Sequence, residues 1–259
     1  MDNQLVKLEH LEGVTIVILN RPDALNALST QLSNQISRTF DQLSRDEQTE
    51  VIILTGAGRS FSVGLDLKEL GGEKSKDKSA TTKDLETALS EVNKPIIGAI
   101  NGFAITGGFE LALMCDFLIA SPKAKFADTH TRVGVVPGWG LSQKLPRLIG
   151  INRAKEISLT GNFIDAQTAR NWGLVNRVVA EQELIPTCIS LAQDILSTDK
   201  ATRDEVRRIM DSGWLSTLDS GLKWEKEANR AHSKRYRPNE SVATRRKSIQ
   251  ERGRGQAND

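Results

Sequence analysis

A strand-like segment that runs into a glycine-rich turn constrains the fold of this 259-residue chain more than any other feature. Residues 94–100 read Lys-Pro-Ile-Ile-Gly-Ala-Ile, and residues 101–110 read Asn-Gly-Phe-Ala-Ile-Thr-Gly-Gly-Phe-Glu. An apolar run then resumes from Glu110 to Cys115. A short apolar run that breaks at glycines and then resumes is typical of a strand, a tight turn and a helix. The segment therefore predicts a strand–turn–helix unit.

The predicted turn brings two kinds of reactive group to the start of one helix. Gly107 and Gly108 fall at the helix N-terminus, where backbone N–H groups lack intrahelical acceptors. The helix dipole favours negative charge there, so an amide at this point can stabilise an oxyanion. Glu110 lies in the first turn, either as a candidate acid or base or as a side chain that only complements the dipole.

Strand and helix patterns alternate through the first third of the chain, and no internal repeat is visible. After about residue 140 the pattern becomes helical, with Asp165 as the expected N-cap and Gly173 as the expected stop of one helix. This order predicts an α/β core with a helical appendage. We expect strands at Val14–Leu19, Val51–Leu54, Phe117–Ala120 and Lys125–Ala127, and a helix face made of Leu28, Leu32, Ile36, Phe40 and Leu43.

Residues 71–84 are polar and lack periodicity. They are expected to form a solvated loop, or a lid beside the preceding glycine-rich turn.

Composition excludes several classes of protein. Lys and Arg total 35 against 33 Asp and Glu, so net charge does not argue for nucleic acid. No apolar stretch approaches the roughly 20 residues that span a bilayer, and the start lacks the pattern of a secretory signal. The two cysteines suit reduced thiols. We expect a cytoplasmic protein, with an organellar matrix as the alternative.

A glycine-rich turn after a strand also invites a dinucleotide-binding interpretation. Gly56 and Gly58 would be the first two glycines of that fingerprint, but the third position holds Phe61. The cofactor interpretation therefore fails.

Many collinear segments resemble the enoyl-CoA hydratase/isomerase (crotonase) superfamily, over essentially the whole chain. The segments that carry the resemblance are residues 19–28, 56–69, 101–116, 126–146, 154–161 and 165–179. The resemblance implies a crotonase-like ββα spiral core in residues 1–195, holding an acyl-CoA site, and a C-terminal helical trimerisation region in residues 196–259. It implies trimers or dimers of trimers. It implies no metal and no cofactor beyond the CoA moiety of the substrate.

By the same resemblance, the backbone N–H groups of Leu65 and Gly107 would hold the thioester oxygen, and Glu110 would be the first catalytic glutamate. Near the C-terminus, Ile249 and Arg252 take the places of an aromatic residue and a lysine that approach CoA in the family, so charge contact could survive without stacking. The CoA path would be lined by Ala24, Leu25, Ser62, Gly64, Leu65, Asp66, Leu67, Lys68 and Gly107.

The chain departs from the family at the second catalytic position, where His130 stands in place of glutamate. Histidine exchanges protons near neutral pH, so it could give a proton to the α carbon or orient water. It could also fill space and bond to Glu110. Asp128, two residues earlier, would orient the ring if both residues were extended on one strand face. Trp139 is bulky where many relatives carry a small residue, and it would restrict the acyl pocket or pack on the helical tail.

The missing glutamate argues against the isomerase reaction of the family. Hydration of a 2-trans-enoyl-CoA remains the leading expectation. The alternatives are a crotonase-family lyase or decarboxylase, and a weakly catalytic acyl-CoA-binding or RNA-binding homologue.

Overall fold

The computed structural model describes residues 4–72, 83–235 and 238–257. Most of the predicted loop at 71–84 lies outside these ranges. The chain forms two compact units, Met1–Ser197 and Thr198–Asp259. The division in the sequence lies two residues after the expected one. Each unit is described by itself.

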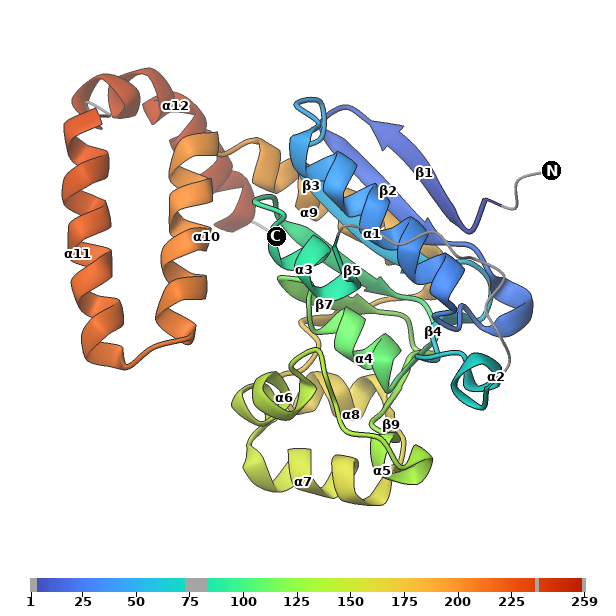
Figure 1. The fold of residues 1–259 in the computed structure, drawn as a ribbon. Coiled ribbons are helices and arrows are strands. Elements are labelled where there is room, and N and C mark those ends of the chain that lie inside the picture. The colour runs from blue at the N-terminus through green and yellow to red at the C-terminus, as the bar shows by residue number, and fades with distance from the viewer. Residues whose placement is uncertain (1–3, 73–82, 236–237, 258–259) are drawn as a thin grey trace. The chain divides into compact units, whose positions relative to one another are not determined.

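The larger unit is built on a six-stranded sheet with the order β1-β2-β3-β5-β7-β10 (Figure 1). All neighbours are parallel except β1, which pairs antiparallel with β2. The sheet is buried on both faces, and its inner strands are accordingly near-continuous β-branched and leucine runs. The strands are β1 (Val6–Leu11), β2 (Val14–Leu19), β3 (Val51–Gly56), β5 (Ile96–Ile100), β7 (Phe117–Ala120) and β10 (Arg177–Val178).

A smaller sheet of four short strands has the order β4-β6-β8-β9. Here β4, β6 and β8 are parallel and β9 is antiparallel to β8. The strands are β4 (Ser60–Ser62), β6 (Phe103–Ile105), β8 (Lys125–Ala127) and β9 (Ile164–Asp165).

The two sheets are linked by a repeated unit that the residue identities do not reveal. A strand of the large sheet, a strand of the small sheet and a helix follow one another as β3-β4-α2, β5-β6-α4 and β7-β8-α5. The expected ββα spiral is therefore confirmed, and the absence of a repeat in the sequence was misleading, because backbone path rather than side-chain identity repeats. Parallel strands end at the same edge of a sheet. The segments that follow β4, β6 and β8 therefore lie side by side.

Two apolar clusters enclose the large sheet. Alternate residues of β3 serve the two sides, with Ile52 and Leu54 in one cluster and Val51 and Ile53 in the other. The second cluster is closed by α9, which presents Leu184, Cys188 and Ala192. The helices of this unit are α1 (Thr30–Arg45), α2 (Leu67–Leu70), α3 (Leu85–Ser90), α4 (Gly107–Ala112), α5 (His130–Val133), α6 (Leu141–Ile149), α7 (Ile151–Thr160), α8 (Ala166–Asn171) and α9 (Leu184–Leu196), with short 3-10 turns at Pro22–Ala24 and Glu181–Glu183.

Local signals for helices mostly hold. The predicted face of α1 is buried through Leu32, Ile36, Phe40 and Leu43, each worth about 1.5–3 kcal/mol when fully buried. Asp165 caps α8 by accepting a hydrogen bond from the Thr168 N–H at 2.8 Å, as expected.

The helix that follows the glycine-rich turn is shorter than expected. It ends at Ala112, so Cys115 follows the helix and its Sγ packs against Gly98 of β5. Both cysteines are free thiols.

The smaller unit contains α10 (Lys200–Trp214), α11 (Leu218–Arg235) and α12 (Pro238–Ala257). Asp199 begins α10 by accepting a hydrogen bond from the Thr202 N–H, and it also pairs with Arg245 of α12 at 2.9 Å. Within the described ranges, no helix is long and apolar enough to cross a membrane.

Candidate active site

The two backbone amides expected to hold an oxyanion lie in neighbouring segments. Leu65 follows β4 and Gly107 begins α4. A Cβ placed on Gly107 would lie 3.5 Å from the Leu65 nitrogen and 3.4 Å from the Gly64 Cα. Among the described residues, neither amide donates a hydrogen bond to another protein group. Two free donors therefore lie in adjacent segments of the backbone.

The paired glycines have different roles. A Cβ on Gly108 would lie 2.1 Å from the Ser62 carbonyl oxygen, so this glycine allows α4 to pack directly on β4. The nearest atoms to a Cβ on Gly107 would instead be those of the Trp139 ring, at 3.3 Å, and of the Gly64–Leu65 backbone. The absence of a side chain at Gly107 keeps the approach to the two amides open.

A strained residue precedes Gly107. Thr106 has φ 53° and ψ −114°, a conformation that costs about 1–3 kcal/mol for a residue other than glycine. Its hydroxyl bonds to the Thr129 hydroxyl and accepts from the Thr129 N–H at 3.2 Å. These contacts tie the turn that carries Gly107 to the segment that carries His130.

The Glu110 carboxylate is held inside the protein by three donors. Its Oε1 accepts hydrogen bonds from the backbone N–H groups of Trp139, at 2.7 Å, and Leu141, at 3.4 Å. Its Oε2 lies 3.4 Å from His130 Nε2. The sequence patterns did not indicate these two amides, of which the second belongs to the first residue of α6.

His130 lies beside Glu110 as expected, but its local structure differs from the expectation. The strand β8 ends at Ala127, and His130 begins the short helix α5, so Asp128 and His130 do not share a strand face. Asp128 Oδ1 nevertheless lies 2.5 Å from His130 Nδ1 and accepts from the His130 N–H at 3.2 Å. A turn, rather than an extended strand, brings the two side chains together.

The surroundings of His130 favour its charged form. Burial by itself would lower the pKa of His130, but hydrogen bonds to Asp128 and then Glu110 raise that pKa to about 9. Burial opposes ionisation of Asp128, whereas the hydrogen bonds of His130 and Ser158 hold the pKa of Asp128 below its ordinary value. The raised pKa of His130 and the lowered pKa of Asp128 therefore favour an imidazolium beside the Asp128 carboxylate.

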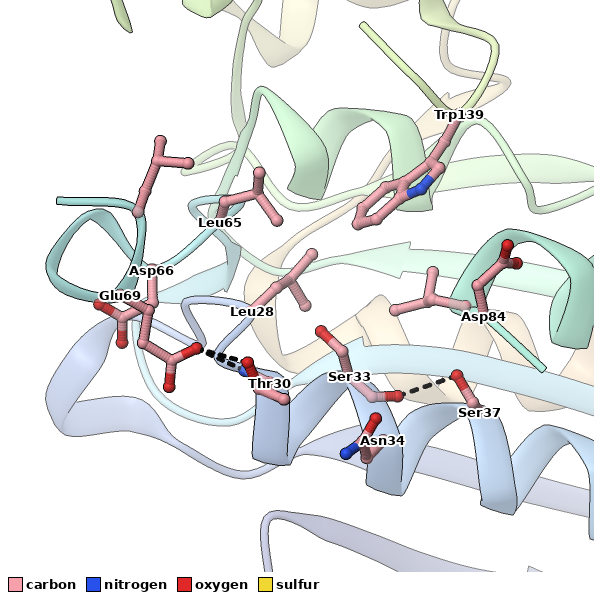
Figure 2. Close-up of a pocket in the computed structure, with 12 residues that line it drawn as sticks. Leu28, Thr30, Ser33, Asn34, Ser37, Leu65, Asp66, Glu69, Asp84 and Trp139 are labelled. Carbon is pink, nitrogen blue, oxygen red and sulfur yellow. Dashed lines mark hydrogen bonds between the residues drawn. The ribbon is translucent and has the colours of Figure 1, made fainter. Parts of the chain in front are cut away.

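A cavity of about 420 Å³ is lined by Leu65, which carries one of the two free amides (Figure 2). The Trp139 ring and the Leu65 side chain project toward it from different loops, and the polar side of α1 forms its floor. The cavity is lined by Leu28, Thr30, Ser33, Asn34, Ser37, Leu65, Asp66, Glu69, Leu70, Asp84, Leu85 and Trp139. Trp139 thus lines this cavity.

A second cavity, of about 460 Å³, shares Leu65, Asp66 and Leu70 with the first. It is lined by five of the residues expected along the CoA path, Ala24, Leu65, Asp66, Leu67 and Lys68. Arg21, Phe163 and Val133 also line it, and the sequence patterns did not indicate these three.

Three other residues expected on the CoA path shape the backbone instead of lining this cavity. The Ser62 hydroxyl is buried and donates to the Asn26 carbonyl at 2.8 Å. Leu25 and Gly64 have positive φ angles of 53° and 84° and turn the chain.

Asp66 would repel an anionic ligand in this cavity if its charge were isolated. Burial opposes the ionisation of Asp66, but Arg21 Nη1 lies 2.6 Å from its Oδ2 and contributes to lowering its pKa. The ion pair balances the carboxylate and leaves Lys68 as a further cation at the cavity wall.

Ile249 and Arg252 lie on α12 of the smaller unit, where Ile249 is exposed.

The fold and the constellation of turns, acid and imidazole define an α/β protein of the crotonase type. The family model for enoyl-CoA hydratase/isomerase matches residues 9–248. The chain therefore belongs to the enoyl-CoA hydratase/isomerase family.

Individual relatives agree with this assignment. A probable peroxisomal enoyl-CoA hydratase 1 of Arabidopsis thaliana is 42% identical over 85% of this chain and 83% of its own length. The crystal structure of an enoyl-CoA hydratase from Mycobacterium tuberculosis is 40% identical, with a TM-score of 0.71 over 87% of this chain and 98% of that one. An enoyl-CoA hydratase structure from Bacillus anthracis gives a TM-score of 0.78 at 35% identity, over 88% of this chain and 90% of that one.

Proposed function

We propose that this protein is an enoyl-CoA hydratase that adds water to a 2-trans-enoyl-CoA thioester. The observation that carries the proposal is the placement of the Glu110–His130 pair, 3.4 Å apart, in a fold where Leu65 and Gly107 leave two amides free. Relatives that match this chain over most of their own length are named as enoyl-CoA hydratases.

The two amides would bind the thioester oxygen. Addition at the β carbon moves electrons onto this oxygen and forms an enolate. Donors fixed in advance stabilise that charge, and each is worth about 10²–10³ in rate in comparable sites. Both donors belong to the backbone, so Leu65 can serve with any side chain.

Glu110, as the base, and His130, as the acid, would carry out the two proton transfers of the hydration. Glu110 takes one proton from water while the hydroxyl oxygen bonds to the β carbon. His130 then gives its Nε2 proton to the α carbon, which collapses the enolate to the thioester. A proton transfer from Glu110 to His130, across the 3.4 Å contact, restores both groups. All three atoms of the water are thus accounted for, and the proposed reaction uses no cofactor beyond the CoA moiety of the substrate.

The second cavity would hold the pantetheine and the CoA phosphates, with Arg21 and Lys68 as the cations at its wall. The first cavity would hold the acyl chain, and Trp139 would limit its bulk next to the reacting carbons.

Replacement of Glu110 by glutamine tests the proposed base. The amide keeps the size of the side chain but accepts no proton, so hydration of crotonyl-CoA should fall by about 10²–10⁴-fold. Loss of absorbance of the conjugated thioester measures the rate. Glu156→Gln on exposed α7 is the matched control and should retain full activity.

Normal hydration by Glu110→Gln would refute this role. If the wild-type protein binds acyl-CoA thioesters but hydrates none across a series of chain lengths, the proposal fails in favour of a lyase or decarboxylase of the same family.

We also propose that the protein assembles as a trimer or a dimer of trimers. The helical unit supports this because several large apolar side chains on it are exposed. They are Met210, Trp214, Leu215, Leu218, Leu222 and Trp224.

A further inference from the structure

His130 is bonded on both sides of its ring, and only one side faces the proposed reaction. Nε2 lies 3.4 Å from Glu110, whereas Nδ1 lies 2.5 Å from Asp128 Oδ1. The ring is therefore part of a line of groups that runs from Asp128 through His130 to Glu110.

The Asp128 carboxylate is buried inside the protein. Its side chain is 2% exposed and that of His130 is 5% exposed. The Ser158 hydroxyl of α7 supplies a further hydrogen bond to Asp128. A buried charge is costly unless it is paired and hydrogen-bonded, so the carboxylate and the ring stabilise each other.

We propose that Asp128 is a positioning residue that holds the His130 ring with its Nδ1 proton bound and its Nε2–H directed at Glu110 and the substrate. The proposal deepens the hydratase function proposed above and rests on it for the chemical role of His130. In this arrangement an aspartate–histidine pair donates the proton at the position where the family resemblance implies a single glutamic acid.

The charge balance follows from the neighbouring groups. Asp128, in the turn before α5, and Glu110, on α4, are the charged groups that act on the ring, and α7 contributes the neutral hydroxyl of Ser158. Asp128 stays ionised while His130 loses and regains its Nε2 proton. Its negative charge stabilises the imidazolium and keeps the second proton at Nδ1.

A purely structural role for Asp128 makes a different prediction. Asp128 Oδ1 also accepts from the His130 backbone N–H, and a residue needed only for that turn would leave the titration of the ring unchanged. The titration of His130 therefore separates the two roles.

Nuclear magnetic resonance of the full chain with labelled histidine tests the proposal. The chain has three histidines, so His10 and His232 serve as internal references. In Asp128→Asn we expect the midpoint of the His130 titration to fall by at least one pH unit, while the other two midpoints stay in place. An unchanged His130 midpoint in folded Asp128→Asn would overturn the proposal.

The wild-type protein provides a second test that needs no variant. Above the midpoint, neutral His130 should carry its remaining proton on Nδ1, facing Asp128, and the nitrogen shifts report which atom is protonated. A proton on Nε2 in the neutral ring would contradict the assignment.

Kinetics then separate this inference from the proposed function. For crotonyl-CoA, Asp128→Asn should lower kcat by about 10²-fold with little change in KM, and should move the alkaline limb of the rate profile to lower pH. A wild-type protein without hydratase activity would refute the function yet leave the ring measurements interpretable. A full-rate Asp128→Asn enzyme would refute the positioning role alone.

Discussion

At the scale of the residue, His130 shows how far side-chain identity informs function. The resemblance marks position 130 as a catalytic place, and the side chain marks it as a group that titrates near neutrality. Asp128 and Glu110 were both expected as partners of the ring. That they contact it at the same time, one on each nitrogen, depends on a turn at Asp128 and on the distance to Glu110, which side-chain identity does not give.

The titration of His130 should appear in the stability of the folded chain. Its pKa in the fold, about 9, lies above the ordinary value of 6.5. The protonated ring therefore stabilises the fold fully below about pH 6.5, and this contribution is lost as the pH rises through 9. Asp128 acts in the opposite sense, because its lowered pKa gives stability that is lost in acid.

Thermal unfolding from about pH 6 to 10 measures this effect. The difference in melting temperature between the wild type and His130→Gln should shrink toward alkaline pH, because glutamine does not titrate. A difference independent of pH would contradict the assigned charge state.

At the scale of the element, the ends of three short strands assemble the site. Leu65, Gly107 and His130 follow β4, β6 and β8 by two or three residues. These strands are parallel neighbours in one sheet, so their carboxyl ends meet. Chain direction and strand order, rather than any long-range recognition between side chains, bring the three residues together.

The two glycines of α4 allow a direct test of this arrangement. Gly108→Ala should mainly destabilise the fold, by about 1–3 kcal/mol or more, because its Cβ would meet the Ser62 carbonyl at 2.1 Å. Gly107→Ala should leave the melting temperature closer to that of the wild type, but should reduce kcat/KM, since its Cβ points toward the Leu65 amide.

Unfolding and hydration assays on both variants give the comparison. An equal loss of stability in both variants would contradict the assignment of packing to Gly108 alone. Full activity in folded Gly107→Ala would contradict the role of Gly107 in keeping the amides accessible.

At the scale of the whole molecule, the proposed assembly rests on the exposed apolar side chains of the smaller unit. Its exposed side chains include Met210 at 68% and Leu215 at 85%, which a monomer would leave in water. We expect sedimentation of the wild type to give three or six times the mass of the chain.

Leu215→Lys should shift the protein toward smaller species, whereas Asn229→Lys, an exposed polar position, should not. A monomeric wild type at micromolar concentration would refute the proposed assembly.

Several parts of the fold follow from local sequence alone. The strands β2, β7 and β8 match their predicted bounds, as does the Asp165 cap, because β-branched runs and capping side chains act on near neighbours. The same patterns failed where distant groups decide. The helix that begins at Gly107 ends at Ala112, and Cys115, which follows it, packs against Gly98 of β5.

The sequence by itself determined the family and several core strands and, through the resemblance to that family, the residues Leu65, Gly107, Glu110 and His130 as candidates. These depend on motifs and on periodicities that span a few residues. Only the tertiary structure decided which distant groups surround them, such as the Trp139 amide on Glu110 and Arg21 on Asp66. Hydrogen bonds and charge interactions act over a few ångströms in space, and residues such as Arg21 and Asp66, 45 positions apart, reach that range only after the chain has folded.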